Sequence, residues 1–330
     1  MIRSITIFVI GLLGHISVVQ AQEDTWQSVA SMPTARESVA ACTVNDRIYA
    51  IGGFPGGSDS GLTTNERYDP GSNSWSAMAS MPTGRRMPVT GTVDGRCYVI
   101  GGRVTDGPRG LDVVEAYDPA SNSWSTRSSM PTARFGHSSA VVDGIVYVVG
   151  GVDRGVLFGT LEAYDPAADS WTTLASMPSP RALAGMAALN GKLYVMGGTS
   201  DGVSSNLSRL DIYDPLTNSW SRGADLPSSI FALAASAANG RVYAIGGADG
   251  PASLNEVQAY DPVNDAWSMV SPMITHRSRF ASVVAGGRIY AIGGTTSFAE
   301  PHVGMNLVER YTPEEASAFP INAGLNDAWY

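Results

Sequence analysis

Two short apolar runs joined by a two-residue turn recur along the chain. In "SVAACTVNDRIYAIGG" (residues 38–53), β-branched and apolar residues flank Asn45 and Asp46. The sister turns are Asp-Gly or Asn-Gly, dipeptides that suit tight hairpins because both central residues need positive φ. They are Asp94–Gly95, Asp143–Gly144, Asn190–Gly191 and Asn239–Gly240. The pattern predicts an antiparallel hairpin at each place.

A third and a fourth strand are expected after each hairpin. A loop of variable composition leads to segments such as "ERYDP", "EAYDP" and "DIYDP", and a short turn then leads to a segment that holds a tryptophan. Proline cannot donate to a strand ladder, so it suits the place where the third strand stops. It stands there at Pro70, Pro119, Pro166, Pro215 and Pro262. Each unit is predicted to be a four-stranded antiparallel meander.

The units repeat at a nearly fixed spacing. Six double glycines follow one another at steps of 49, 49, 47, 49 and 47 residues, each with a tyrosine three residues before it. They are Gly52–Gly53, Gly101–Gly102, Gly150–Gly151, Gly197–Gly198, Gly246–Gly247 and Gly293–Gly294. A fixed period of this length, built from strands, predicts a β-propeller.

The two ends of the repeat complement each other. Trp26 lies 49 residues before Trp75 and has no unit before it, whereas the sixth unit reaches "ERYTP" (309–313) without its tryptophan. We therefore expect the N-terminal strand to complete blade six, which removes the exposed edges of an open array. The first and last units would then be neighbours, consistent with "RIYAIGG" occurring at both 47–53 and 288–294.

The double glycines, tyrosines, "YDP" segments and tryptophans at these spacings resemble Kelch repeats over about residues 25–312. The resemblance implies an all-β fold, a six-bladed β-propeller of four-stranded antiparallel blades, for which we set the bounds 22–313. The family spans many functions, so the fold alone does not assign one.

Residues 1–21 have the pattern of a secretory signal peptide. A basic Arg3 precedes an apolar run, and small residues end the segment. A transmembrane anchor is the alternative, but His15 and Ser17 interrupt the run, which is too short to span. We expect cleavage before Gln22 and a secreted product, periplasmic or extracellular, with no transmembrane segment remaining.

The tail, 314–330, drops the repeat. Its "NAGLNDAWY" resembles the opening of a separate module found at the C-terminus of some secreted bacterial proteins, although too little is present to fold alone. Either the chain is a fragment, with the tail the start of a truncated module, or the tail packs on the ring.

Cys42 and Cys97 are the two cysteines of the chain. The repeat puts them on different strands of different units, so we expect two buried free thiols rather than a disulfide.

Charge narrows the range of partners. Thirty acidic residues against 21 basic ones give a net charge of −9, which argues against a nucleic-acid or anionic-membrane binder. The basic residues are almost all arginine, the side chain suited to bidentate recognition of carboxylates.

An arginine and a carboxylate recur together in the repeat. Five units carry an arginine just before the first strand: Arg36, Arg85, Arg134, Arg181 and Arg277. The same five carry an acid two residues before the third-strand tyrosine: Glu66, Glu115, Glu162, Asp211 and Glu309. Blade five has lost both, with Ile230 and Gln258 in their places. The paired loss favours a scaffold of ion pairs.

Ligands of propellers usually bind where loops gather at one end of the channel. Arg279, Arg103, Arg109 and Arg154 lie in such loops without an acid partner in the repeat, and are the better ligand candidates. The resemblance to Kelch adaptors that recruit substrates to ubiquitin ligases implies a pocket in which Arg36, Arg134, Arg181 and Arg279 grip acidic peptide side chains. The predicted ligand-binding residues are Arg279, Arg134, Arg36, Arg181, Arg103, Arg109 and Arg154.

Signatures of catalysis are weak. His137 and His276 begin blades on opposite sides of the ring, too far apart to share a metal. The secreted copper oxidases among the Kelch propellers need a tyrosine crosslinked to a cysteine, but Cys97 and Tyr98 are strand neighbours that point to opposite faces. We assign no catalytic, metal or cofactor residue.

Two functions remain open. The first is a secreted Kelch-propeller binding protein whose arginine-rich face takes a protein partner, an acidic peptide or an anionic sugar. The second is an enzyme similar to the periplasmic Kelch epimerases that interconvert sialic acid anomers, in which arginine holds the carboxylate and a Glu or His moves a proton. The long blade insertions of that family are missing here, and we expect no enzyme.

Overall fold

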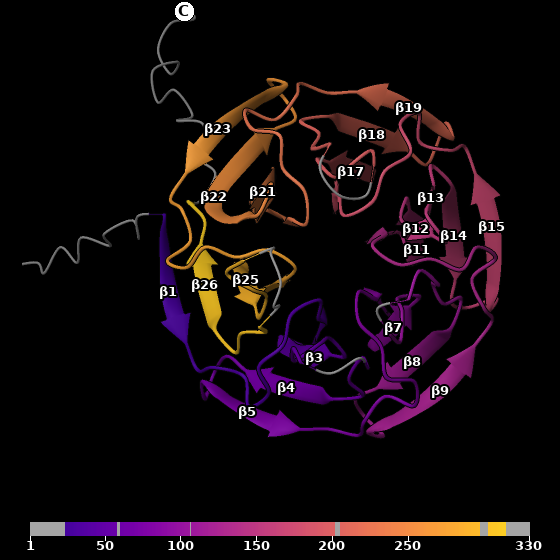
Figure 1. Ribbon diagram of the computed structural model, residues 1–330, viewed down its shortest axis with the longest axis vertical. Coiled ribbons are helices and arrows are strands. Elements are labelled where there is room, and N and C mark those ends of the chain that lie inside the picture. The colour runs from indigo at the N-terminus through magenta and orange to yellow at the C-terminus, as the bar shows by residue number, and fades with distance from the viewer. Residues whose placement is uncertain (1–23, 58–59, 106, 202–204, 298–302, 315–330) are drawn as a thin grey trace, which may run out of the picture.

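Six antiparallel sheets form a ring around a central channel (Figure 1). The computed structural model describes residues 24–57, 60–105, 107–201, 205–297 and 303–314. Each sheet has four strands and is one blade, which confirms the predicted all-β, six-bladed propeller. In the part of the chain described, no helix is long and apolar enough to cross a membrane. The predicted signal peptide and all but the first residue of the tail lie outside the described residues.

The strands of each blade run in sequence from the channel outward. Blade one consists of β2 (Ala40–Val44), β3 (Arg47–Ile51), β4 (Asn65–Asp69) and β5 (Ser74–Ala77). Blade two consists of β6 (Val89–Val93), β7 (Arg96–Ile100), β8 (Val114–Asp118) and β9 (Ser123–Arg127). Blade three consists of β10 (Ser138–Val142), β11 (Ile145–Val149), β14 (Leu161–Asp165) and β15 (Ser170–Leu174). Blade four consists of β16 (Gly185–Leu189), β17 (Lys192–Met196), β18 (Leu210–Asp214) and β19 (Ser219–Arg222). Blade five consists of β20 (Ala234–Ala238), β21 (Arg241–Asp249), β22 (Ala252–Asp261) and β23 (Ala266–Val270). Blade six consists of β24 (Ala281–Ala285), β25 (Arg288–Ile292), β26 (Val308–Thr312) and, outermost, β1 (Thr25–Val29).

The N-terminal strand closes the ring. β1 pairs with β26 from Thr25 opposite Thr312 to Val29 opposite Val308, which confirms that blade six is built from both ends of the chain. Trp26 stacks on Tyr311 with ring centroids 5.0 Å apart, and its Nε1 donates to the carbonyl of Ser271, 2.9 Å away. The first strand is therefore held by a backbone ladder, a ring stack and a side-chain hydrogen bond.

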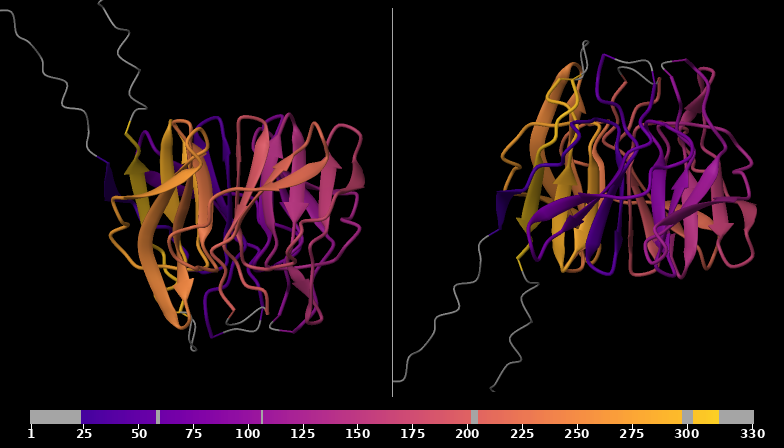
Figure 2. Two further views of the ribbon diagram at one scale, coloured as in Figure 1. Left: turned by 90° about the horizontal axis from the view of Figure 1, so that it is seen from above. Right: turned by 90° about the horizontal axis from the view of Figure 1, so that it is seen from below.

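The two faces of the ring differ (Figure 2). One face, here called the turn face, carries the tight hairpins such as Asn190–Gly191, whose φ values of 51° and 72° explain the Asn-Gly dipeptide. The other, the loop face, carries the segments after the double glycines and those that enter the inner strands. Two blades carry additional strand pairing there: β12 (Val152–Asp153) pairs with β13 (Val156–Leu157) in blade three, and β21 and β22 are extended in blade five.

Neighbouring blades are joined by one repeated contact. The indole of Trp75 donates to the carbonyl of Ala30 at 2.7 Å, and the N–H of Ala30 donates to Oδ1 of Asn73 at 2.8 Å. The same pair of bonds joins each later outer strand to the blade before it: at Trp124 and Asn122, Trp171 and Asp169, Trp220 and Asn218, Trp267 and Asp265. The repeated tryptophan thus serves packing between blades.

Five buried ion pairs anchor the entering segments to the third strands. Arg36 is fully buried; its guanidinium lies 2.7 Å from the Glu66 carboxylate and donates to the carbonyls of Ala50, Gly52 and Thr64. Burial, opposed by Glu66, lowers the pKa of Arg36 to about 10. The other pairs are Arg85–Glu115, Arg134–Glu162, Arg181–Asp211 and Arg277–Glu309, at 2.5–2.8 Å.

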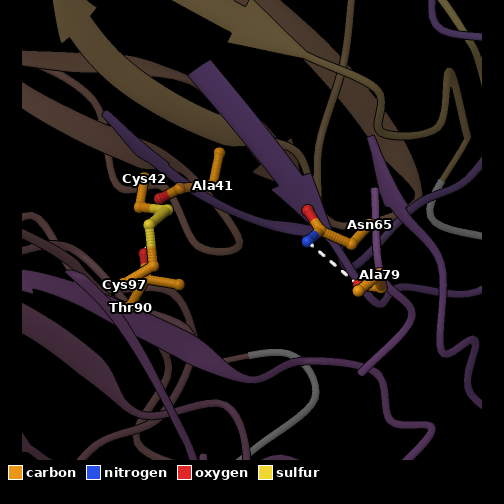
Figure 3. Close-up of a disulfide and its surroundings, with 6 residues drawn as sticks. All are labelled: Ala41, Cys42, Asn65, Ala79, Thr90 and Cys97. Carbon is orange, nitrogen blue, oxygen red and sulfur yellow. Dashed lines mark hydrogen bonds between the residues drawn. A yellow bond between two sulfur atoms is a disulfide. The ribbon is translucent and has the colours of Figure 1, made fainter. Parts of the chain in front are cut away.

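The expectation of free thiols is wrong: Cys42 and Cys97 form a disulfide (Figure 3). The repeat assigned them correctly to β2 of blade one and β7 of blade two, but those strands contact each other across the boundary between the blades. Their Cα atoms are 6.1 Å apart, within the range that a disulfide spans. Strand assignment alone did not show which side chains of neighbouring blades meet.

Blade five offers a test of the scaffold pairs. Gln258 is 1% exposed, and neither its Oε1 nor its Nε2 has a hydrogen-bond partner within the described structure. Gln258→Glu puts an unpaired carboxylate there and is expected to lower the free energy of unfolding by about 3 kcal/mol. Adding Ile230→Arg should recover most of that loss, as measured by urea denaturation. Adding Ile230→Met instead is the control and should recover nothing; equal stability of the two double variants would contradict the scaffold role.

Candidate functional site

One residue per blade forms a ring at the loop-face end of the channel. It lies two places after the repeated arginine, has φ between 53° and 61°, and is buried or half-buried. The members are Ser38, Met87, Gly136, Leu183, Ala232 and Arg279, called here the inner ring. Backbone hydrogen bonds of 2.6–3.0 Å join most neighbours, each N–H donating to the carbonyl of the preceding blade.

Beneath the inner ring lies a channel cavity of about 540 Å³. Its wall consists of residues from the six inner strands, mostly alanine, glycine, valine, serine and threonine. Arg279 is the one arginine among the lining residues. His137 also lines it, but burial lowers its pKa to about 3, and a ring nitrogen lies 3.2 Å from the carbonyl of Ile100. The neutral imidazole therefore adds no charge, and the positive end of the channel is at Arg279.

Arg279 is paired with an acid that the repeat did not reveal. Its Nη1 lies 3.1 Å from Oε1 of Glu37, whose side chain is 0% exposed, whereas that of Arg279 is 11% exposed. The pair joins blade six to blade one, next to the 2.6 Å hydrogen bond from the N–H of Ser38 to the carbonyl of Arg279. It belongs to the junction at which the ring closes.

Two further arginines lie near this pair. Arg86 and Arg103 face each other in an antiparallel bridge; Arg86 lies 4.4 Å from the ring centre of Phe54, and Arg103 lies 4.5 Å from that of Phe135. Burial, together with the charges of Arg86 and Arg279, lowers the pKa of Arg103 to about 10 against the opposing effect of Glu37. We call Arg86, Arg103, Arg279 and Glu37 the arginine cluster. The guanidinium groups of Arg86, Arg103 and Arg279 thus lie close enough for their charges to act on one another at this end of the channel.

The predicted ligand residues fall into three groups. Arg36, Arg134 and Arg181 are 0% exposed and lie in the scaffold pairs. Arg103 and Arg279 come together in the arginine cluster.

Arg109 and Arg154 are exposed at the rim. The N–H of Arg154 donates to the carbonyl of Pro108 at 2.7 Å, so the loops of blades two and three lie side by side, and the Arg154 side chain lies 3.7 Å from Asp153.

Sequence reasoning missed Arg86, Glu37, Phe54 and Phe135. They occupy the place after the repeated arginine or the place after the double glycine, and these two places pair as a bridge in each blade. In blades one and two the pairs are Glu37 with Phe54 and Arg86 with Arg103, whereas in blades four and six they are Ala182 with Thr199 and Ser278 with Thr295. The sequence did contain a signal: the residues at these two places differ from repeat to repeat, whereas the residues next to them are nearly constant.

The described residues contain no group of three or more His, Cys, Asp or Glu side chains that could hold a metal ion.

Arg279 and Arg36 are expected to differ in their effect on stability. Arg279→Ala should lower the free energy of unfolding by about 1.5–3 kcal/mol, the usual cost of a hydrogen bond to a charged group. Arg36→Ala should cost about 3–5 kcal/mol, because it leaves Glu66 and several carbonyls buried without their donor. Urea denaturation of both variants measures the two free energies of unfolding. An unchanged free energy of unfolding for Arg279→Ala, or a loss as large as that of Arg36→Ala, would contradict this description of the junction.

Comparison with known proteins agrees with the fold. The Attractin/LZTR1 β-propeller model matches residues 11–257, and the Kelch motif matches residues 276–317. A search of curated proteins found no match. A solved structure titled "Structure of YjhT" is similar, with a TM-score of 0.76 and 19% identity over 87% of this chain and 98% of that one. That likeness supports the fold alone, whereas the family match spans most of the chain: this protein belongs to the Attractin/LZTR1 β-propeller family and is built of Kelch repeats.

Proposed function

We propose that this protein binds a carboxylate-bearing ligand at the loop face, with Arg103 and Arg279 as its donors. The observation that carries the proposal is the arginine cluster at the mouth of the channel, in which Arg279 is paired with Glu37 and the charges of Arg86 and Arg279 act on Arg103. Guanidinium matches carboxylate geometry in a bidentate manner and is the usual choice for such recognition. Arg86 is 1% exposed, so it adds positive charge without offering a surface.

The depth of the cluster favours a small or protruding acid. Glu37 is fully buried and Arg279 is 11% exposed, so a flat protein surface would not reach them. An anionic sugar fits this depth, and so does a single acidic side chain on a peptide or a protein loop. Arg109 and Arg154 at the rim supply positive charge that steers either ligand inward. We favour the sugar acid, because the channel wall beneath Arg279 carries hydroxyl groups of serine and threonine.

A second candidate is turnover at the same place, of the sialic acid epimerase type. The observation that favours it is Glu37, a carboxylate beside the donors that would hold a substrate acid. A general base needs to reach the proton that it abstracts. Glu37 is buried against Arg279, which favours a role in positioning that arginine and leaves binding as our first proposal.

We also propose that the protein works outside the cytoplasm. The Cys42–Cys97 disulfide supports this, because structural disulfides persist in oxidising compartments and are rare in a reducing cytosol. The signal-peptide pattern of residues 1–21 points the same way.

Ligand NMR tests binding and turnover together. N-acetylneuraminate, glucuronate and galacturonate are each mixed with the protein, and their proton line widths and anomer exchange are recorded. We expect broadening without faster exchange than in buffer, and about a tenfold rise in Kd for Arg103→Ala, since one charged hydrogen bond is worth about that factor. Arg47→Ala, an exposed arginine paired with Asp69 on the turn face, is the matched control and should bind normally. Accelerated anomer exchange would show that the protein is an enzyme. Line broadening of an acidic peptide, but of none of the sugar acids, would show that the ligand is a protein rather than a sugar.

Export is tested by expressing the full chain with its own N-terminus in a bacterial host. The periplasmic or extracellular fraction should contain a protein that begins at Gln22 and whose two thiols resist alkylation until reduced. Mass spectrometry measures both properties. An intact N-terminus retained in the cytosolic fraction with two free thiols would overturn the assignment.

A further inference from the structure

The inner ring is open at one step. Hydrogen bonds run from Ser38 N to Arg279 O, Met87 N to Ser38 O, Leu183 N to Gly136 O, Ala232 N to Leu183 O, and Arg279 N to Ala232 O, at 2.6, 2.9, 2.7, 2.8 and 3.0 Å. Among the described residues the sixth step, from the N–H of Gly136 to the carbonyl of Met87, has no hydrogen bond. One N–H and one carbonyl at the mouth of the channel are thus left without the partners that their sister residues have.

The opening is local and does not come from separated blades. The N–H of Gly102 donates to the carbonyl of Arg134 at 3.0 Å across this same boundary, as Gly53 does to Arg85 and Gly151 to Arg181 at 2.9 Å across the neighbouring ones. A ring nitrogen of His137 contacts the carbonyl of Ile100 across it as well. Blades two and three are therefore joined normally, and only the link of the inner ring is missing.

The open step lies under the arginine cluster. Arg103 of blade two stacks over Phe135 of blade three, so its guanidinium spans the boundary next to Gly136. Met87 directly follows Arg86 in the chain. Gly136 is also the one inner-ring residue without a side chain, so nothing of its own covers its N–H.

A backbone N–H that lacks a partner in a half-enclosed site is a strong donor to an anion, because desolvation makes its hydrogen bond worth more than in water. Backbone N–H groups beside arginine commonly bind the second oxygen of a carboxylate or another oxyanion. We propose that the N–H of Gly136 donates to one oxygen of the bound carboxylate while Arg103 binds the other. This inference rests on the proposed function and adds to it a backbone donor that no side chain of the cluster supplies.

Amide hydrogen exchange tests the open step without any ligand. In the ¹⁵N-labelled protein, the Gly136 amide should exchange at least about tenfold faster than the hydrogen-bonded amides of its five sisters in the inner ring. Those amides, in the same ring and at the same φ, are internal controls. Exchange of Gly136 as slow as that of its sisters would overturn the proposal outright.

Addition of the sugar acid tests the donor. With N-acetylneuraminate or glucuronate, the Gly136 amide proton should move downfield and its exchange should slow, together with changes at the Arg103 Nε–H. A ligand that shifts Arg103 but leaves Gly136 unchanged would refute the backbone donor while the proposed function stands. No change at either would refute both.

A side chain at position 136 gives an independent readout. An added Cβ would lie 3.2 Å from Cδ2 of Leu183, a flexible side chain, and residues with side chains hold the same φ at the five sister places. Gly136→Ala should therefore fold, with a urea midpoint lowered by the strain of a side chain at positive φ, while Kd for the sugar acid rises about tenfold because the methyl group narrows the approach of the ligand. Ala232→Ser, across the ring in blade five, is the matched control and should leave Kd unchanged. Normal affinity of Gly136→Ala would contradict the proposal.

Discussion

The ladder between β1 and β26 is the connection on which the rest of the ring depends. Every other blade is made from one continuous stretch of chain, whereas blade six is held by five residue pairs between segments about 280 positions apart. If that ladder opens, β26 becomes an edge strand whose outer N–H and C=O groups are unpaired. The Arg279–Glu37 pair crosses the same junction, so the candidate site has its correct geometry only in the closed ring.

Arginine has two roles that differ in how its charge is balanced. In the scaffold each buried arginine has its own carboxylate and a set of backbone carbonyls, so the pair is internally neutral and closed to ligands. At the mouth of the channel Arg279 is paired with Glu37, while Arg86 and Arg103 lie over the rings of Phe54 and Phe135. In the second arrangement the guanidinium groups lie close enough to lower the pKa of Arg103, whereas in the scaffold each arginine lies beside its own carboxylate.

The sequence was sufficient to predict the structural features that recur in the repeats. Blade number, strand order, the closing strand and the five scaffold pairs all follow from positions that recur, because each recurrence is an independent observation of the same local structure. The arginine cluster was only half visible: Arg103 and Arg279 were identified, but Glu37 and Arg86 were not, since each occurs in a single blade and its neighbours are set by packing around the ring. The prediction of free thiols failed for the same reason, because contact between β2 and β7 depends on how two sheets face each other.

The described residues begin and end at the turn face, opposite the arginine cluster. Thr25 pairs with Thr312 at the turn-face end of blade six, and the Asn239 amide of a turn-face hairpin donates to the carbonyl of Glu314. The described chain therefore enters and leaves the ring on the side away from the loop face. Attachment of the protein through either of these points would leave access to the arginine cluster unobstructed.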